Sequence, residues 1–244
     1  MISHADEQGI SLGSMAYRLA RFIVRLILRL VARLELQGYE NIAIIDGGAL
    51  AVSNHLGRLD VALVYYYLDR RDILVLVAEK YQKIGVIRWF VKALGAAFVD
   101  RFNADLNTMR IAMNHLKQGK ILVLAPEGTR SPTGALIEAR AGASYLAAQT
   151  GVWVIPIGLY GSEDSAVVDA FRHFRRAHIC AAIGKPFKFP PLQREHREET
   201  LQAYTEEMMC QIAALLPEKY RGVYTDMPRL KEILIEQTKS SPVT

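Results

Sequence analysis

Cysteine is scarce in this sequence, and its two cysteines form no pattern that binds a metal ion. Cys180 and Cys210 lie in apolar or helical patterns, and neither is adjacent to a histidine. Two thiols at this spacing do not match a set of metal ligands. We therefore expect two buried, neutral thiols in a reducing compartment, and neither a metal site nor a cysteine nucleophile.

The sequence also lacks internal repeats, low-complexity tracts and a glycine-rich linker. Half of the residues are hydrophobic (51%) and only 23% are charged, which excludes a disordered chain. A length of 244 residues suits one large core or two small ones, and the simplest division is one domain with an N-terminal appendage. The net charge of +5 suits a polyanion or an anionic membrane surface and does not separate the two.

The first 13 residues lack the apolar stretch that a signal peptide requires, and we expect them to form a frayed leader. Residues 14–34 contain no acidic side chain. Instead they place arginines among apolar residues at positions 18, 21, 25, 29 and 33. In a helix these arginines form one stripe about 120° wide, opposite a broad apolar face.

Two interpretations of a helix at 14–34 remain open. The segment is long enough to span a bilayer, but each central arginine would cost roughly 2.5–3.5 kcal/mol there. Lying flat avoids that cost, because the apolar face enters the acyl region and the arginines meet anionic head groups. The alternative is a core helix with a solvated arginine face. The missing acidic residues and the wide apolar arc favour the membrane surface.

Apolar runs alternate with amphipathic segments along the rest of the chain. We expect strands at 34–38, 42–45, 49–52, 73–78, 95–101, 121–125, 152–161 and 177–184. We expect helices at 59–68, 80–94, 103–117, 139–150 and 197–216. The basic, aromatic-bearing helix at 80–94 is either a core helix or a second interfacial contact. The alternation predicts an α/β fold with a mixed, largely parallel sheet flanked by helices.

A histidine lies at the point where a strand gives way to a helix. His55 follows the apolar run 49–52 and precedes the helix that starts near Leu59, which is the usual place for a site on an open α/β sheet. Asp60 follows five residues later, so the pair is a potential base with an orienting partner. The alternative is a polar loop in which Asp60 caps the helix, and this stretch alone favours that alternative.

Two more polar clusters follow predicted strands, Arg101 after one strand and Glu127 to Arg130 after another. Since the carboxyl ends of parallel strands gather at one edge of a sheet, all three clusters can converge. A histidine base would deprotonate a hydroxyl, and two arginines would hold an anionic group such as a phosphate. Gly128 would permit close backbone approach and Thr129 would donate a hydrogen bond. Taken singly, Arg101 is explained by a surface ion pair, and Glu127 to Arg130 are explained by a polar turn.

Four ordered blocks of the sequence resemble those of the glycerolipid acyltransferases, in particular the bacterial 1-acylglycerol-3-phosphate acyltransferases. The blocks span about 100 residues and are Asn54-His55 with Asp60, 95–101 (GAAFVDR), 126–131 (PEGTRS) and 154–157 (VIPI). The segment 216–224 (LPEKYRGVY) resembles the ending of that subfamily. The order and spacing of all four blocks together carry the resemblance.

The resemblance implies a role for each of these residues. His55 would be the general base on an acceptor hydroxyl that attacks an acyl thioester directly, and Asp60 would fix the imidazole tautomer and stabilise the imidazolium. This requires His55 to precede the helix and Asp60 to lie in its first turn. The implied phosphate pocket comprises Arg101, Glu127, Gly128, Thr129 and Arg130. No metal, cofactor or covalent intermediate is implied, and the co-substrate is acyl-CoA or an acyl carrier protein.

This chain departs from the family pattern at two places. The family often has serine two residues after the histidine, where this chain has Gly57. A Lys-x-Gly sequence after the third block is replaced by Arg140-Ala141-Gly142. Arg140 can still meet a phosphate, so the second change is mild. The first change removes one polar contact and bears on the choice of acceptor more than on the reaction.

The resemblance predicts a membrane-associated O-acyltransferase that converts 1-acylglycerol 3-phosphate (lysophosphatidic acid) to phosphatidic acid at the cytoplasmic face of the membrane. Its partners would be the lyso-lipid, the thioester donor and an anionic membrane surface. Alternatives are the same chemistry on glycerol 3-phosphate or another lyso-lipid, or a non-catalytic membrane-binding module. Nucleic acid is disfavoured because the arginines are interleaved with aliphatic residues. We expect a leader and basic helix at 1–34, an acyltransferase domain at 35–225 and a tail at 226–244.

Overall fold

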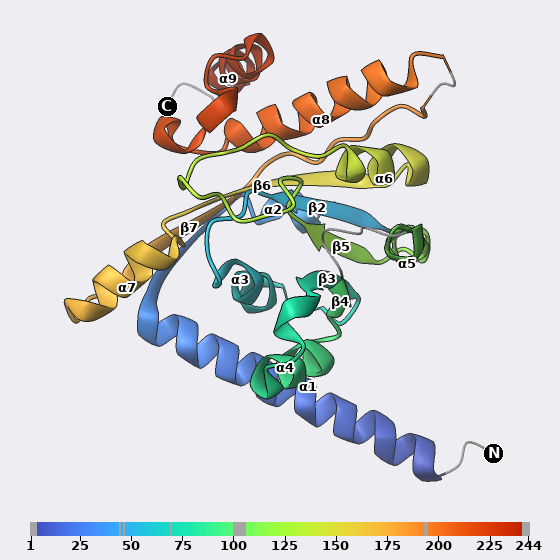
Figure 1. Cartoon of the computed structure of the whole chain (residues 1–244), viewed down its shortest axis with the longest axis vertical. Helices are drawn as coiled ribbons and strands as arrows, with labels where there is room; N and C mark the ends of the chain where they lie inside the picture. The colour runs from blue at the N-terminus through green and yellow to red at the C-terminus, as the bar shows by residue number, and fades with distance from the viewer. Residues whose placement is uncertain are drawn as a thin grey trace.

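A seven-stranded sheet forms the centre of the molecule (Figure 1). The computed structural model describes residues 4–43, 45, 47–68, 70–99, 106–192 and 195–240, and the side chains of these except 4–14, 43, 106–107 and 240. The strand order is β1-β7-β6-β2-β5-β3-β4, and only the β6–β7 pair is antiparallel. The predicted mixed, largely parallel sheet is therefore confirmed. The strands are β1 (Ala32–Gln37), β2 (Ala49–Ser53), β3 (Ile73–Ala78), β4 (Ala97–Val99), β5 (Ile121–Leu124), β6 (Trp153–Tyr160) and β7 (Ala177–Ile183).

Helices cover both faces of the sheet. They are α1 (His4–Val31), α2 (Glu40–Ala43), α3 (Asp60–Tyr67), α4 (Gly85–Leu94), α5 (Leu106–Lys117), α6 (Gly142–Thr150), α7 (Asp164–Arg172), α8 (Arg197–Ala213) and α9 (Pro228–Ser240). Alternate residues of one strand serve the two faces, as a period of two requires. Leu50 and Val52 of β2 pack with α5, α6, α8 and α9. Ala49 and Ala51 pack toward α1, α3 and α4.

Four local expectations are wrong. The apolar run at 42–45 is not a strand, because the chain turns at Gly38 (φ +72°) into the short helix α2. The expected helix at 80–94 is interrupted, with a 3-10 turn at Glu79–Tyr81 before α4 begins at Gly85. The leader is helical from His4 onward. The expected tail contains α9, whose Leu230 and Ile233 are buried in the same core cluster as α8.

The apolar arc of α1 is divided between the protein and the outside. Tyr17, Ala20, Val24 and Leu28 are buried beneath the helix, against residues of α3 and of the sheet. A second row of α1, which we call the outer stripe, is exposed and consists of Met15, Leu19, Phe22, Leu26 and Leu30. Neither of the two interpretations made from the sequence describes the helix fully, because α1 is a core helix that also presents an apolar row outward.

The arginine stripe of α1 is divided as well. Arg21 is 6% exposed, and its Nε donates a hydrogen bond of 3.1 Å to the carbonyl oxygen of Tyr65 in α3. Arg18 and Arg29 are exposed. The uniform solvated stripe predicted from the sequence is thus interrupted where α1 crosses α3. Within the described residues, no helix is both long enough and apolar enough to cross a membrane.

Candidate active site

His55 lies between the carboxyl end of β2 and the start of α3, and most of its side chain is buried. Its imidazole Nδ1 is 2.7 Å from Asp60 Oδ2. Asp60 is the first residue of α3, so the structure has the arrangement that the spacing of the pair requires. An ionised carboxylate only accepts hydrogen bonds, so Nδ1 carries the hydrogen and Nε2 keeps its lone pair. His55 is oriented to act as a base through Nε2.

Three more donors hold the carboxylate of Asp60. Its Oδ2 accepts hydrogen bonds from the backbone N–H groups of Leu56 (2.7 Å) and Gly57 (3.0 Å). Its Oδ1 accepts a hydrogen bond of 2.6 Å from the hydroxyl of Ser162. Asp60 and Ser162 are both buried, so these bonds are shielded from water. Asp60 is fixed through both oxygens and cannot turn away from the imidazole.

Gly57 marks the place where the Ser162 segment comes closest to the His55 loop. A Cβ atom on Gly57 would lie 1.9 Å from the carbonyl oxygen of Ser162, a distance that no side chain tolerates. A serine at this position, as the resembled family often has, would push the Ser162 backbone away from Asp60. Glycine therefore allows a hydroxyl from beyond β6 to reach the carboxylate. This explains the departure in terms of packing inside the site.

Two buried side chains tie the His55 loop to the rest of the sheet. The amide of Asn54 donates to the carbonyl oxygen of Leu159 (2.8 Å) and accepts from its N–H (2.7 Å), which fastens β2 to β6. The carboxylate of Glu127 accepts from the N–H of His55 (2.8 Å) and from the N–H of Ile137 (3.1 Å). Burial raises the pKa of Glu127, and the two backbone donors oppose that shift. Glu127 thus ties the backbone of His55 to that of Ile137.

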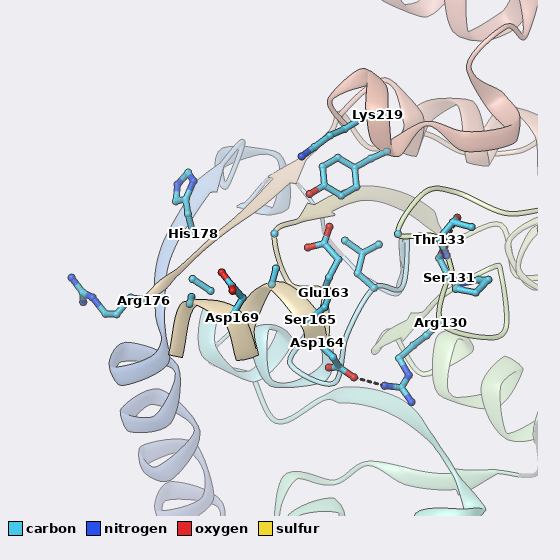
Figure 2. A pocket seen from close by; sticks show the side chains of 18 of the residues that line it. Arg130, Ser131, Thr133, Glu163, Asp164, Ser165, Asp169, Arg176, His178 and Lys219 are labelled. Carbon is cyan, nitrogen blue, oxygen red and sulfur yellow. Dashed lines mark hydrogen bonds and ion pairs between the residues drawn. The ribbon is translucent and has the colours of Figure 1, made fainter. Parts of the chain in front are cut away.

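Arg130 is held at the edge of the site by an ion pair. Its NH1 donates to Asp164 Oδ2 at 2.8 Å, and its NH2 is 3.4 Å from the hydroxyl of Tyr81 (Figure 2). Asp164 is the first residue of α7, and its Oδ1 also accepts a hydrogen bond of 2.9 Å from the N–H of Arg58. The guanidinium therefore has a defined orientation while part of it still faces the cavities. Arg130 lines one of the pockets that His55 also lines.

The other predicted phosphate ligands line a cationic pocket of about 620 Å³. Gly128 adopts φ +69°, which favours glycine, and Arg140 packs over it. Four cations and one carboxylate surround the pocket, which suits an anion. Its polar lining residues are Glu79, Lys80, Gln82, Lys83, Arg88, Thr129 and Arg140. The predicted ligand Arg101 lies outside the described residues.

Two apolar pockets meet at His55. One has a volume of about 330 Å³ and lies among α1, α3 and α4, with Leu28, Tyr65 and Phe90 in its walls. The other has a volume of about 240 Å³ and lies among β3, β5, α5 and α6, with Ala112 and Ala143 in its walls. His55 lines both pockets. The base therefore stands where two apolar channels join, close to the cationic pocket.

A larger hollow of about 1180 Å³ adjoins the site on the side of α7 (Figure 2). Arg130 and Asp164 form its near wall, and Lys219 and His178 lie toward its far side. Acidic and basic side chains are mixed along its walls. Among the described residues, no group of histidine, cysteine, aspartate and glutamate side chains has an arrangement that would hold a metal ion.

Several residues of the site carry no local signal in the sequence. Ser162 and Asp164 lie beyond β6. Ser162 is more than 100 positions from Asp60 in the sequence, yet the two side chains are hydrogen-bonded. Lys80, Lys83 and Arg88 were assigned from the sequence to a core or membrane helix, yet they line the same pocket as Arg140. The alternation of basic and apolar residues at 80–94 indicates a basic surface, but it does not indicate which part of the protein that surface faces.

Comparison with known proteins identifies the family. A family model described as Acyltransferase matches residues 33–160, slightly more than half of the chain. The chain is similar to the chloroplastic 1-acyl-sn-glycerol-3-phosphate acyltransferase LPAT1 of Arabidopsis thaliana, with 30% identity over 162 residues, 63% of this chain and 43% of that protein. The corresponding Brassica napus enzyme BAT2 is 32% identical over 136 residues, 52% of this chain and 37% of that protein. The chain thus spans less than half of the length of these two relatives.

Bacterial proteins resemble the chain over a greater share of their length. The 1-acyl-sn-glycerol-3-phosphate acyltransferase of Bacillus subtilis strain 168 is 23% identical over 199 residues, 82% of this chain and 96% of that protein. The crystal structure of the 1-acyl-sn-glycerophosphate acyltransferase PlsC from Thermotoga maritima superposes with a TM-score of 0.60 at 21% identity, over 85% of this chain and 83% of that one. The structural likeness supports the fold, and the family match spans β1 through β6 with His55, Asp60 and Arg130 inside it. The chain belongs to the acyltransferase family.

Proposed function

We propose that this protein moves a fatty acyl group from a thioester to the free sn-2 hydroxyl of 1-acylglycerol 3-phosphate, giving phosphatidic acid. The observation that carries the proposal is an oriented histidine base at the junction of two apolar pockets and beside a cationic one. The acceptor has one part for each feature: a hydroxyl, an acyl chain and a phosphate. The relatives named above bear this activity in their names, which supports the same assignment here.

The chemistry needs only groups that the chain supplies. Nε2 of His55 takes the proton of the acceptor hydroxyl as its oxygen attacks the thioester carbonyl carbon. The imidazolium is stabilised by Asp60, which Ser162 and two backbone N–H groups hold in place. The tetrahedral intermediate then collapses, the C–S bond breaks, and the thiolate leaves with the proton from His55. An ester forms, a thioester is consumed, and the base returns to its neutral state.

The two apolar pockets favour an acceptor that carries its own acyl chain. A donor chain occupies one pocket in any acyl transfer, and glycerol 3-phosphate would leave the other pocket without a ligand. The pocket beneath α1 is lined by Ile27, which is 45% exposed, so it opens toward the outer stripe. We assign this pocket to the acceptor chain, which arrives from a lipid surface, and the inner pocket to the donor chain. The donor itself is an acyl thioester of coenzyme A or of acyl carrier protein.

The outer stripe of α1 supports association with a membrane surface. Phe22 is 63% exposed and Leu30 is 66% exposed, and such a row on one helix is costly in water. The exposed Arg18 and Arg29 flank the row, where they would meet anionic head groups. We therefore assign the protein to the cytoplasmic face of the membrane, held there peripherally or monotopically by α1.

Replacement of His55 by alanine tests the assignment of the base. The His55→Ala variant should lose about 10²–10⁴-fold in turnover, which is the typical contribution of general-base catalysis. Wild type and variant should be assayed with lysophosphatidic acid, glycerol 3-phosphate and neutral lyso-lipids, each with both thioester donors. Lysophosphatidic acid should be the best acceptor by a wide margin.

The controls separate loss of chemistry from loss of structure. The variant should retain the circular dichroism spectrum and thermal midpoint of the wild type, because His55 is at the surface of the pockets and not in the core. A His115→Ala variant removes a histidine of α5 whose Nε2 hydrogen-bonds the backbone carbonyl oxygens of Asp72 and Ile121, and it should keep full turnover. Near-normal turnover of His55→Ala would refute the assignment of His55 as the base. A preference for glycerol 3-phosphate would refute the assignment of lysophosphatidic acid as the acceptor.

A further inference from the structure

The helix α7 ends in a group of exposed apolar side chains that the reaction does not use. Val168 is 47% exposed, Phe171 is 71% exposed and Phe174 is fully exposed. We call residues 168–176 the α7 tip. Isolated exposed apolar residues are ordinary, but two phenylalanines three positions apart, with a valine one turn before them, form a patch.

The exposure of this patch follows from how α7 packs. Val167 and Ala170 on the inner side of the helix pack against the core cluster that contains Val24 and Leu28 of α1. Val168 and Phe171 lie on another side of the helix and are exposed. Phe174 follows the helix with φ +53°, a conformation that is uncommon for a side chain of this size. The backbone turn thus holds an aromatic ring away from the protein.

The charge around the patch is strongly positive. The α7 tip contains three arginines, Arg172, Arg175 and Arg176, all exposed, and a single acidic residue, Asp169. Asp169 is shared between His173 (3.4 Å) and Arg175 (3.8 Å). Guanidinium groups beside exposed aromatic rings are the composition of a lipid interface, where the rings enter the head-group zone and the cations meet anionic lipids.

The patch is next to the outer stripe of α1. Arg176 NH1 donates to the carbonyl oxygen of Arg29 at 3.4 Å, so the α7 tip touches the carboxyl end of α1. Leu30, the last residue of the outer stripe, follows Arg29 directly. Figure 1 shows α7 projecting beside the end of α1 where that helix joins β1, on the side away from α8 and α9. The two exposed apolar regions therefore form one edge of the molecule.

We infer that the α7 tip is a second contact with an anionic bilayer, which together with the outer stripe of α1 fixes how the protein lies on the membrane. The inference rests on the proposed membrane association and adds a surface to it. Contacts on two different helices prevent the protein from rolling about the axis of α1. Because Asp164 at the other end of α7 holds Arg130, the same helix joins the lipid contact to the active site.

Vesicle binding by the full-length chain tests the inference. The variant Phe171→Ser/Phe174→Ser removes both rings, and Val223→Ser/Ile235→Ser removes two apolar residues of similar exposure (58% and 53%) near α9. Binding is measured by sedimentation with phosphatidylcholine vesicles containing or lacking 30% phosphatidylglycerol. We expect the α7 variant to bind the anionic vesicles about tenfold more weakly and the matched control to bind as the wild type does. An α1 variant, Phe22→Ser/Leu30→Ser, provides the reference for loss of the first contact.

Each outcome has one meaning. Unchanged vesicle binding of the α7 variant, with weakened binding of the α1 variant, would overturn the inference and leave the proposed function intact. Loss of self-association in size-exclusion chromatography, without a change in vesicle binding, would assign the patch to a second protein copy and also overturn it. Turnover in detergent with lysophosphatidic acid is a separate measurement. It should be equal in all variants, and its absence in the wild type would refute the proposed function without bearing on the lipid contact.

Discussion

At the scale of single residues, the site is built around the carboxylate of Asp60. Four donors converge on it: the imidazole of His55, two backbone N–H groups and the hydroxyl of Ser162. The backbone donors come from the same turn, whereas the hydroxyl comes from the segment that follows β6. A carboxylate that is fully hydrogen-bonded before the substrate arrives needs no reorganisation when positive charge develops on the imidazole.

Removal of the Ser162 hydroxyl should slow turnover without weakening acceptor binding. We expect Ser162→Ala to reduce kcat about tenfold, since an unmet hydrogen bond to a buried acceptor costs about 1–3 kcal/mol, and to leave the KM for the acceptor unchanged. Steady-state kinetics measure both parameters.

Ser165 provides the control for that experiment, since it is exposed and lies three residues along the same segment. Ser165→Ala should keep the kcat and the KM of the wild type. If Ser162→Ala raised KM and left kcat unchanged, Ser162 would act on substrate binding and the positioning role would be wrong.

At the scale of helices and strands, the sequence predicts best where local pattern and environment agree. The apolar runs that became β2, β3, β5, β6 and β7 are buried on both faces, so composition alone marks them as strands. The run at 42–45 has the same composition, but a left-handed glycine at position 38 and a hydrogen bond from Asn41 to Ile183 turn the chain into a helix. α7 was not predicted, because its outer face carries apolar residues and masks the helical period.

Parts of the site were predictable for the same reason, and others were not. His55, Asp60 and Arg130 belong to short polar clusters that directly follow buried strands, and topology alone brings such clusters together. Ser162 and the two lysines of the segment before α4, Lys80 and Lys83, reach the site only through tertiary packing. The hydrophobic period or residue spacing of one segment does not predict which distant segment it will contact.

The contact between α8 and α9 makes stability depend on pH. Burial alone would raise the pKa of Glu207, but hydrogen bonds from Arg229 and Gln211 hold that pKa below its ordinary value. A lowered carboxyl pKa contributes stability above about pH 4.5 and loses it as the pH falls through the folded-state value. Glu207→Gln should therefore reduce the free energy of unfolding by about 1 kcal/mol at pH 7 and by less at pH 3.

Urea denaturation of wild type and variant at the two pH values measures the difference. Glu232 also pairs with Arg229 but is 61% exposed, so Glu232→Gln should have a smaller effect at pH 7. An equal loss from Glu207→Gln at both pH values would show that the carboxylate charge is not what joins the two helices.

At the scale of the whole molecule, two layers of helices each supply one apolar pocket, and the sheet edge between them supplies the base. Ala62 lines the pocket beneath α1, and Ala143 lines the inner pocket. Leucine at either position adds three carbon atoms to the wall. Ala143→Leu should reduce turnover of the longest donor chain about tenfold, and Ala62→Leu should do the same for the longest acceptor chain, since overfilling a packed site costs about 1–3 kcal/mol.

A matrix of donors and acceptors of 8 to about 18 carbon atoms, which covers chains that both fit and exceed the narrowed pockets, checks the assignment. Ala143→Leu should shorten the range of donor chain lengths that are turned over, and Ala62→Leu should shorten the range of acceptor chain lengths. Each variant should leave the other range as in the wild type. If both substitutions restricted only the donor, the two pockets would form one channel for a single chain, and an acceptor without an acyl chain would fit the site equally well.

The pairing of β1 with β7 has a consequence for synthesis on the ribosome. The first strand of the sheet hydrogen-bonds only to β7 among the described strands, so it has no partner until residue 183 has left the exit tunnel. Until then α1, with its apolar outer stripe, precedes an incomplete sheet, a state in which exposed apolar surface favours aggregation. A nearby bilayer would shelter that helix during the interval. Under the proposed membrane association, lipid contact and folding would overlap in time, and the surface proposed to hold the folded chain would also protect the nascent one.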